Sequence, residues 1–401
     1  MKKGWQKKRL GDVTTKIGSG ATPRGGDESY KAEGISLIRS LNVYDDGFRE
    51  AKLARIDNEQ ADGLSNVVVE PHDVLLNITG ASVARCCRAP ADFLPARVNQ
   101  HVSIIRPVQE KLDSDFLHYL LISKTYKDRL LHTGEEGGST RQAITKAQLQ
   151  EFVVEFPESL AEQQRIVGLL DEAFEGLATA KTNAEKNLQN ARALFESHLQ
   201  SVFTQRGSGW VEKPLGEVAE VQSGGTPSVP EKTYWGGNIP WYSSGELNEI
   251  HTTDPERKIT EAGLNNSNAK LFPKGALLIG MYDTAALKMS ILDRDGTFNQ
   301  AIAGVKPNER VEVEFILHAI NAVKPRLLLE RRGVRQKNLS LGKIKEIKIP
   351  IPLPTMQRAV VMSLRNVVAE TQRLARIYER KLAALAELKK SLLHQAFTGE
   401  L

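Results

Sequence analysis

Two long segments of the chain carry a stripe of apolar residues at helical spacing. The apolar positions alternate steps of four and three, and an extra step of four interrupts the stripe at Ala184–Leu188 and again at Tyr378–Leu382. This pattern predicts one long helix per segment and, because the interruptions match, an antiparallel coiled coil of the two helices. The alternative is two amphipathic helices that each pack on their own domain. The predicted helix-helix seam consists of Ile166, Leu170, Leu177, Leu188, Phe195, Val360, Leu364, Leu374, Tyr378, Leu382 and Leu385.

The rest of the chain has the pattern of compact mixed domains. Short β-like runs such as Val74–Ile78 and Ala276–Ile279 alternate with turn-forming residues and short helical stretches. This pattern predicts the α+β class, with two similar globular α/β-mixed domains separated by the two long helices. We place the first domain at residues 1–158, the first helix at 159–206, the second domain at 207–353 and the second helix at 354–401.

The sequence repeats itself at a slowly drifting offset. Leu10-Gly11-Asp12-Val13 returns 205 residues later at 215–218, and Asn99-Gln100 returns 200 residues later at 299–300. At the start of the helices, Gln164-Arg165 is matched with Gln357-Arg358 at an offset of 193. A constant order of matches with a smooth drift indicates two copies of one unit that differ by small loop deletions.

The repeat also closes around the ends of the chain. Phe203-Thr204 is followed by Trp210, and Phe397-Thr398 would be followed by Trp5 if the two ends were joined. A helix of about 45 residues spans about 65 to 70 Å, which is longer than such a domain is wide. We therefore expect a pseudo-twofold dumbbell whose helical rod fixes the spacing of two related domains. A ruler of this kind suits a ligand that is read in two halves, such as duplex DNA.

Composition narrows the class of protein without fixing its function. The 401 residues are 40% hydrophobic and 26% charged, and the net charge of +5 permits nucleic-acid binding without demanding it. No uncharged apolar run approaches the ~18 residues of a membrane helix, and the start MKKGWQKKRL lacks the apolar core of a signal peptide. The adjacent Cys86 and Cys87 fit neither a disulfide framework nor a metal knuckle. We expect a cytoplasmic protein that has no membrane contact.

Sequence motifs of common enzyme classes are missing. The chain has no GxGxxG after a strand, no GxxxxGK followed by Ser or Thr, no HExxH, no GxSxG and no Asn-Pro-Pro-Tyr string of the adenine methyltransferase type. The eight histidines are scattered without ligand spacing. The hypothesis that follows is a non-catalytic chain with no metal and no cofactor of its own.

Several motifs together resemble the specificity subunit of Type I restriction-modification enzymes. They are the Ser-Gly-x-Thr-Pro loop, Tyr-Trp-Gly-Gly-Asn-Ile-Pro-Trp at 234–241, the Asn-Gln pair before a strand, the Arg-Gln pair before a strand that ends in Pro, and Glu-Gln-Gln-Arg-Ile-Val at 162–167. The resemblance covers essentially the whole chain, in two copies. It is carried by the arrangement of the repeats more than by any single motif.

The resemblance implies a division of labour with partner subunits. Each globular domain would be a target recognition domain that reads one half of a bipartite sequence in double-stranded DNA. The helices would set the spacer and dock two methyltransferase subunits, and restriction subunits would join that core. S-adenosylmethionine, ATP and Mg are expected on the partner subunits, so the assembled complex would be the adenine-specific methyltransferase and ATP-dependent endonuclease.

The two copies depart from each other and from the family pattern. The first copy has Tyr30-Lys31-Ala32-Glu33-Gly34 in place of the Trp-Gly-Gly motif. The second helix opens with Thr355-Met356-Gln357-Arg358 where the family often has Glu-Gln-Arg. These departures leave the predicted fold unchanged. They suggest two different half-sites and therefore an asymmetric target.

Polar residues on loops at the strand ends are the candidate DNA contacts, because bases and phosphates are read by hydrogen-bonding groups that reach a groove. In the first domain they are Ser19, Thr22, Arg24, Arg39, Asn42, Asn77, Thr79, Ser82, Arg141 and Gln142. In the second domain they are Ser223, Thr226, Tyr242, Ser243, Tyr282, Thr284, Arg335, Gln336 and Lys337. The adjacent Arg and Gln pairs are favoured, since Arg pairs with guanine and Gln with adenine. A phosphate contact or a structural role stays open for each residue.

A protein-protein scaffold is the rival hypothesis. In that case the rod would join two interaction domains that touch no DNA. Salt separates the two hypotheses, because affinity falls steeply with salt only where phosphates release counterions.

Overall fold

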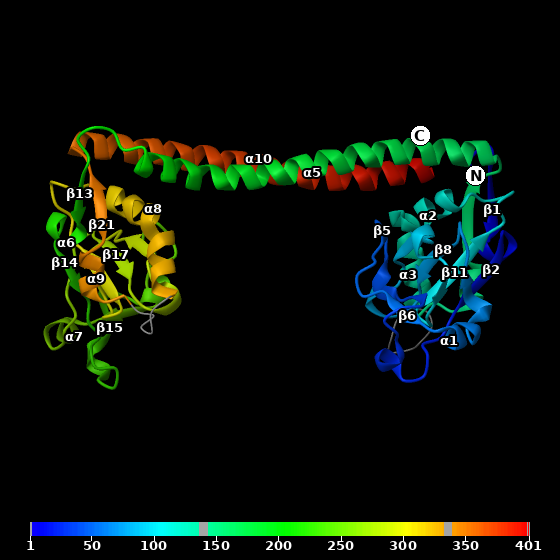
Figure 1. The fold of residues 1–401 in the computed structure, drawn as a ribbon, viewed down its shortest axis with the longest axis horizontal. Helices are drawn as coiled ribbons and strands as arrows, with labels where there is room; N and C mark the ends of the chain where they lie inside the picture. Colours follow the sequence, from blue (N-terminus) through cyan, green and yellow to red (C-terminus); the bar gives the residue numbers. More distant parts are fainter. Residues whose placement is uncertain (1, 136–142, 333–338, 399, 401) are drawn as a thin grey trace. The chain divides into compact units, whose positions relative to one another are not determined.

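The computed structural model describes residues 2–135, 143–332, 339–398 and 400. The chain folds into two compact units: unit 1 comprises Met1–Glu185 and Arg380–Leu401, and unit 2 comprises Lys186–Glu379. The long helices α5 (Leu160–Thr204) and α10 (Pro354–Thr398) each contribute one part to unit 1 and one part to unit 2 (Figure 1). The prediction of two mixed domains with two long helices is confirmed.

Unit 1 is built on two four-stranded sheets, ordered β2-β11-β8-β9 and β6-β3-β10-β7, and on two small strand pairs, β1-β12 and β4-β5. The strands are β1 (Trp5–Arg9), β2 (Thr14–Ser19), β3 (Ile35–Ile38), β4 (Val43–Tyr44), β5 (Gly47–Phe48), β6 (Ala54–Ile56), β7 (Val68–Val69), β8 (Val74–Asn77), β9 (Cys86–Arg88), β10 (Ala96–Val98), β11 (Val102–Pro107) and β12 (Val153–Pro157). The helices are α1 (Asn58–Asp62), α2 (Ser114–Ile122), α3 (Lys124–Glu135) and α4 (Lys146–Glu151).

Unit 2 repeats this topology, except that its second sheet has three strands instead of four and its described residues include no counterpart of the β4-β5 pair. Its sheets are ordered β14-β20-β17-β18 and β16-β15-β19, and β13 pairs with β21 as β1 pairs with β12. The strands are β13 (Val211–Pro214), β14 (Val221–Ser223), β15 (Trp235–Tyr242), β16 (Arg257–Ile259), β17 (Leu277–Gly280), β18 (Met289–Ile291), β19 (Thr297–Phe298), β20 (Ile302–Val305) and β21 (Lys348–Ile351). The helices are α6 (Leu215–Val218), α7 (Glu261–Asn265), α8 (Val313–Arg332) and α9 (Leu341–Lys345).

In each unit the core joins the mixed domain to parts of both long helices. In unit 1, Ile166 and Leu170 of α5 and Leu393 and Ala396 of α10 belong to the same buried cluster as α2. Leu199 and Phe203 of α5 and Val361 and Leu364 of α10 pack in the same way in unit 2. The helices therefore pair with each other and also pack on the domains. The coiled coil and the packing on the domains, which the sequence offered as alternatives, both occur.

The antiparallel direction follows from polar contacts in unit 2. Arg192 of α5 pairs with Glu379 of α10 at 3.0 Å, whereas His198, further along α5, contacts Ser363, which lies earlier in α10. Of the predicted seam residues, Ile166, Leu170 and Leu364 are buried, and the others are half-buried.

A buried glutamine marks the start of each long helix. The side chain of Gln163 donates to the backbone carbonyls of Lys111 and Pro157 and accepts from the backbone N–H of Asp113. Gln357 makes the equivalent hydrogen bonds with Arg310, Pro352 and Glu312. Both side chains are fully buried. These bonds satisfy backbone groups that would otherwise be buried without partners, which explains why an amide stands at this position.

This equivalence corrects the repeat at the helix starts. Gln163, not Gln164, corresponds to Gln357, and Gln164 is exposed. The offset is therefore 194, the same offset that relates the interruptions of the two apolar stripes.

Aromatic triads close each unit. In unit 1, Phe116 of α2 lies 6.1 Å from Trp5 and 5.3 Å from Phe397, measured between ring centroids. In unit 2, Phe315 of α8 lies 5.9 Å from Trp210 and 5.4 Å from Phe203. In unit 2 the contact brings together the end of α5 and the segment that directly follows it. In unit 1 the equivalent contact brings together the end of α10 and β1, which lie at opposite ends of the chain. This is the closure expected from the sequence.

Candidate nucleic-acid interface

In unit 1 the strand register brings four loops to one edge of the sheets. β11 is antiparallel to β2 and β8, and its first residues pair with the ends of both strands, Ser103 with Ser19 and Val102 with Asn77. β10 runs parallel to β3, so these two strands end at the same edge. The loops after β2, β3 and β8 and the turn between β10 and β11 therefore emerge together.

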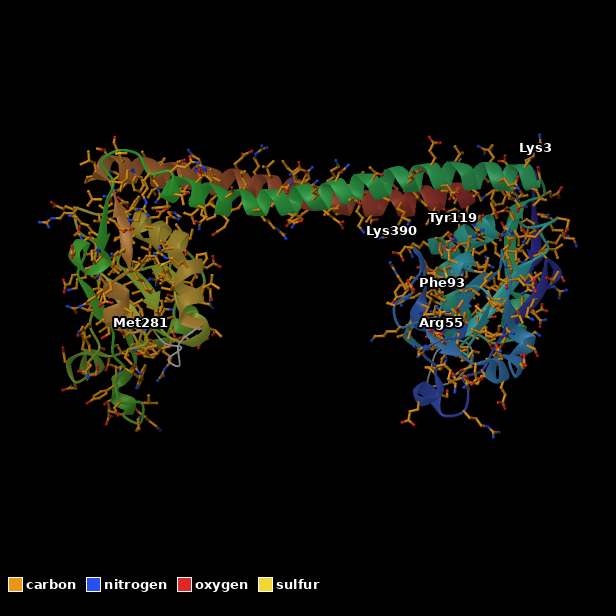
Figure 2. The ribbon with its side chains drawn as sticks, in the orientation of Figure 1. Lys3, Arg55, Phe93, Tyr119, Met281 and Lys390 are labelled. Atoms are coloured by element: carbon orange, nitrogen blue, oxygen red, sulfur yellow. The ribbon has the colours of Figure 1, made fainter. Side chains whose placement is uncertain are left out.

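Unit 2 places the corresponding loops at the corresponding edge. Ser223 at the end of β14 pairs with Ala303, and Gly280 at the end of β17 pairs with Ile302. β15 and β19 run parallel and end together. Met281, the first residue after β17, marks this edge in unit 2 and lies away from the long helices (Figure 2). Tyr119 on α2 marks the opposite side of the domain in unit 1, where it lies beside α5. The edge that gathers the predicted contact loops is thus the same in both units.

The Ser-Gly-x-Thr-Pro loop is fixed by the same contact in each copy. The Thr22 hydroxyl donates to the side-chain oxygen of Gln100 at 2.5 Å, and Thr226 donates to Gln300 at the same distance. Both glutamines are exposed. The Ser-Gly-x-Thr-Pro loop and the Asn-Gln pair, two separate motifs in the sequence, therefore form one structural feature.

The glycine of this loop is required for space. A Cβ atom on Gly20 would lie 1.8 Å from the carbonyl oxygen of Val98, and one on Gly224 would lie 2.1 Å from that of Phe298. Neither glycine has a positive φ. Glycine is therefore required at these positions for its small size and not for its conformational freedom, which is the usual reason for glycine in a turn.

Two tryptophans anchor the loop in unit 2. The indole N–H of Trp241 donates to the carbonyl of Gly225 at 3.0 Å, and that of Trp235 donates to the carbonyl of Ser228 at 3.1 Å. The Arg257 guanidinium lies over Trp235, 3.5 Å from the ring centroid. This anchoring explains the aromatic motif at 234–241, which the first copy lacks.

Three predicted contact residues have buried side chains, and we correct their assignment to a supporting role. Asn42 bonds to the backbone of Arg39, Arg49 and Ala51. Asn77 donates to the carbonyl of Ser40 at 2.9 Å, and the Tyr242 hydroxyl donates to the carbonyl of Thr253 at 3.2 Å. At most 1% of each residue is exposed, so none of them reaches a groove. Sequence reasoning failed here because a polar residue at a strand end can turn inward to hold the next loop.

Other predicted residues lie at the loop edge with varied exposure. Arg24 and Thr284 are exposed, and Ser19, Ser82, Ser223 and Tyr282 are half-buried. Arg39 donates to the carbonyl of Lys52 at 2.7 Å and lies over the ring of Tyr30. The Ser243 hydroxyl donates to Glu246, which ties it to its own turn.

The two favoured Arg and Gln pairs lie outside the described residues: Arg141 with Gln142, and Arg335 with Gln336 and Lys337. The described residues that follow them are tied to the loop edge. Ala143 forms a β-bridge with Thr79, and the N–H of Leu339 donates to the carbonyl of Met281 at 2.9 Å.

The adjacent cysteines lie on β9 in the interior. Burial raises the pKa of Cys87 to about 12 and raises the pKa of Cys86 well above its usual value. Such thiols stay protonated at neutral pH and are poor nucleophiles and metal ligands. Within the described ranges, no three His, Cys, Asp or Glu side chains are grouped to hold a metal ion. No helix of those ranges is long and apolar enough to cross a membrane.

Comparison with known proteins identifies the family. Residues 2–188 and 207–379 each match the Type I restriction modification DNA specificity domain, and the chain belongs to this family. The specificity subunit of the Type I restriction enzyme EcoR124I/EcoR124II from Escherichia coli is 29% identical over 242 residues, 56% of this chain. The MjaIX specificity subunit from Methanocaldococcus jannaschii is 29% identical over 160 residues, 39% of this chain. These matches span 57% and 37% of the two relatives.

The fold is also found in a solved structure. The crystal structure of the HsdS subunit from Thermoanaerobacter tengcongensis matches with a TM-score of 0.72 at 20% identity, and the match covers 100% of this chain and 98% of that one. The repeated domains and the long helices are therefore a fold that the two proteins share.

Proposed function

We propose that this chain is the DNA specificity subunit of a Type I restriction-modification complex. Each mixed domain binds one half of a bipartite target in double-stranded DNA through the loops gathered at one sheet edge. The observation that carries the proposal is the repeated edge, where the same four loops emerge in both units and the same Thr-Gln contact fixes one of them. Family membership supports it.

The proposed target is asymmetric, because equivalent loops differ in their side chains. Thr79 of unit 1 corresponds to Tyr282 of unit 2, and His101 corresponds to Ala301. Different donors and acceptors at equivalent places select different bases. In this proposal the mixed domains of residues 1–158 and 207–353 are the target recognition domains, and the helices of residues 159–206 and 354–401 set the spacer.

Catalysis is assigned to partner subunits. The helices dock two methyltransferase subunits, and restriction subunits join that core, with S-adenosylmethionine, ATP and Mg bound by the partners. This role places the chain in the cytoplasm beside chromosomal DNA.

A map of adenine methylation in the source cells, with the gene intact and deleted, tests the proposal. The expected result is the loss of one asymmetric two-part motif on deletion. Binding of the purified complex to duplex DNA should also fall steeply between low and moderate salt, since phosphate contacts release counterions. An unchanged methylation map together with salt-independent binding would favour the protein-protein scaffold instead.

A further inference from the structure

The side-chain amide of Gln100 is held from both sides by neighbouring loops. Its oxygen accepts the hydroxyl proton of Thr22, and its nitrogen lies 3.1 Å from Nε2 of His101. On the other side of the imidazole, Nδ1 of His101 lies 2.5 Å from the Thr79 hydroxyl. A chain of hydrogen bonds therefore links the loop after β2 to the loop after β8 through the turn before β11.

The direction of these hydrogen bonds follows from the orientation of the Gln100 amide, whose oxygen faces Thr22 and whose nitrogen faces His101. Because the Gln100 oxygen accepts from Thr22, its amide nitrogen can only donate, and Nε2 of His101 must accept. In neutral imidazole the proton then lies on Nδ1, which donates to Thr79. The amide of Gln100 is thus oriented by its surroundings before any ligand arrives.

Counting donors and acceptors shows what the amide still offers. A glutamine amide has two N–H groups and two lone pairs on its oxygen. Thr22 uses one lone pair and His101 uses one N–H, which leaves one donor and one acceptor on an exposed side chain at the centre of the loop edge. Gln300 of unit 2 is held on the Thr226 side in the same way, and Ala301 stands where unit 1 has His101.

The remaining donor and acceptor discriminate among the groups of DNA. Phosphate oxygens only accept, so a phosphate would engage the donor of the amide and leave its acceptor to water. In the major groove, guanine presents two acceptors, cytosine one donor and thymine one acceptor, whereas adenine presents an acceptor at N7 beside a donor at N6. Adenine is therefore the single base that pairs with both groups of the amide in the major groove.

We infer that Gln100 and Gln300 are specificity-determining residues that each read an adenine, one in each half of the DNA target. This inference rests on the proposed function, which assigns the loop edge to DNA but leaves these two residues out. Thr22 and Thr226 are positioning residues in this scheme, because they act by orienting the glutamines.

Selection from a library of random duplex DNA tests the inference. The full chain, tagged and purified from its source cells with the subunits that accompany it, is offered the library, and the bound fraction is sequenced. For Gln100→Ala we expect the preference for adenine to fall by roughly 5- to 150-fold at one position of one half-site, with the other half-site unchanged. Gln300→Ala should show the same loss in the other half-site.

A second substitution tests whether the base preference at this position can be changed instead of lost. Gln100→Glu has the same shape but only accepts hydrogen bonds, so the preferred base at that position should move from adenine toward cytosine, whose N4 group donates. Gln109→Glu, at an exposed residue beyond the opposite end of β11, is the matched control and should leave the whole motif unchanged. The unaltered half-site shows in each variant that the protein is folded.

The outcomes separate the inference from the proposed function. If the unsubstituted protein selects no two-part motif, the proposed function fails and the inference fails with it. If it selects one, and both alanine variants keep every adenine preference or weaken all positions equally, the glutamines do not read bases and only the inference is overturned.

Discussion

Gln163 and Gln357 lie 194 positions apart in the chain and make the same three hydrogen bonds, each at the first turn of a long helix. Each amide joins its helix to the strand end before it and to the loop that leads into α2 in unit 1 or α8 in unit 2. One buried polar side chain therefore reinforces the apolar packing that attaches the start of each long helix to a mixed domain.

Replacing Gln163 with Leu should weaken unit 1 specifically. The change leaves two carbonyls and one N–H buried without partners, so we expect the free energy of unfolding to fall by about 2 to 4 kcal/mol. Trp5 is a tryptophan of unit 1, whereas Trp210, Trp235 and Trp241 belong to unit 2, so fluorescence in urea with Trp5 retained alone follows unit 1. Gln164→Leu, at the exposed neighbour, is the control and should change stability by less than about 0.5 kcal/mol.

Phe397 and Phe203 should prove equivalent in energy although one lies near the end of the chain. Phe397 packs on Phe116, and Phe203 packs on Phe315. Replacement of either ring with Ala removes aromatic contacts and leaves a cavity, which should lower the free energy of unfolding by about 2 to 4 kcal/mol. Phe397→Ala should lower the urea midpoint of unit 1, and Phe203→Ala that of unit 2. Leu388→Ala, at an exposed residue of α10, serves as control. A wild-type midpoint in the Phe397 variant would contradict the closure of unit 1 by α10.

Glu314 should make the stability of unit 2 depend on pH. Burial of the Glu314 carboxylate opposes its ionisation. Hydrogen bonds from Arg365, whose Nε lies 2.9 and 3.1 Å from the two carboxylate oxygens, and from the nearby His318 outweigh this effect and lower the pKa of Glu314 from 4.5 to about 2. The ionised form is therefore favoured by folding. Its contribution is complete above pH 4.5 and is lost as the pH falls through about 2.

Glu314→Gln tests this dependence. Because Arg365 is half exposed and solvent screens the pair, we expect a loss of only about 1 to 2 kcal/mol at pH 7. The difference between the wild type and the variant should shrink as the pH falls from 4.5 toward 2, measured by urea unfolding at a series of pH values. A difference that stays constant over this range would show that the carboxylate charge is not involved.

Gly20→Ala should displace the loop after β2. The added Cβ would overlap the Val98 carbonyl, so the backbone must shift at a cost of about 1 to 3 kcal/mol. Under the proposed function, selection from random duplex DNA should then lose the half-site of unit 1 and retain the other. In Gly18→Ala, within β2, the added Cβ meets no atom within 4 Å, and the variant should bind as the wild type does.

The sequence predicted the architecture better than the site, for a physical reason. Helical periodicity and the repeat extend over many residues, so they identified the long helices and the closure of Trp5 with Phe397. The role of a single polar residue depends on whether a turn directs it inward, and Asn42, Asn77 and Tyr242 point inward. Gln100 was missed although its signal was present: a Thr-Pro loop and an Asn-Gln pair recur together in both copies.

The division of each long helix between two units has a consequence for shorter chains. A chain that stopped after residue 206 would keep the domain of unit 1 but lack the α10 segment that covers it, and its own α5 segment 186–204 would have no core to join. Because Leu199 and Phe203 correspond to Leu393 and Phe397, that segment can cover the same domain in a second copy. Two half-length chains would then exchange helices and form a homodimer with identical ends, and a palindromic ligand would match it.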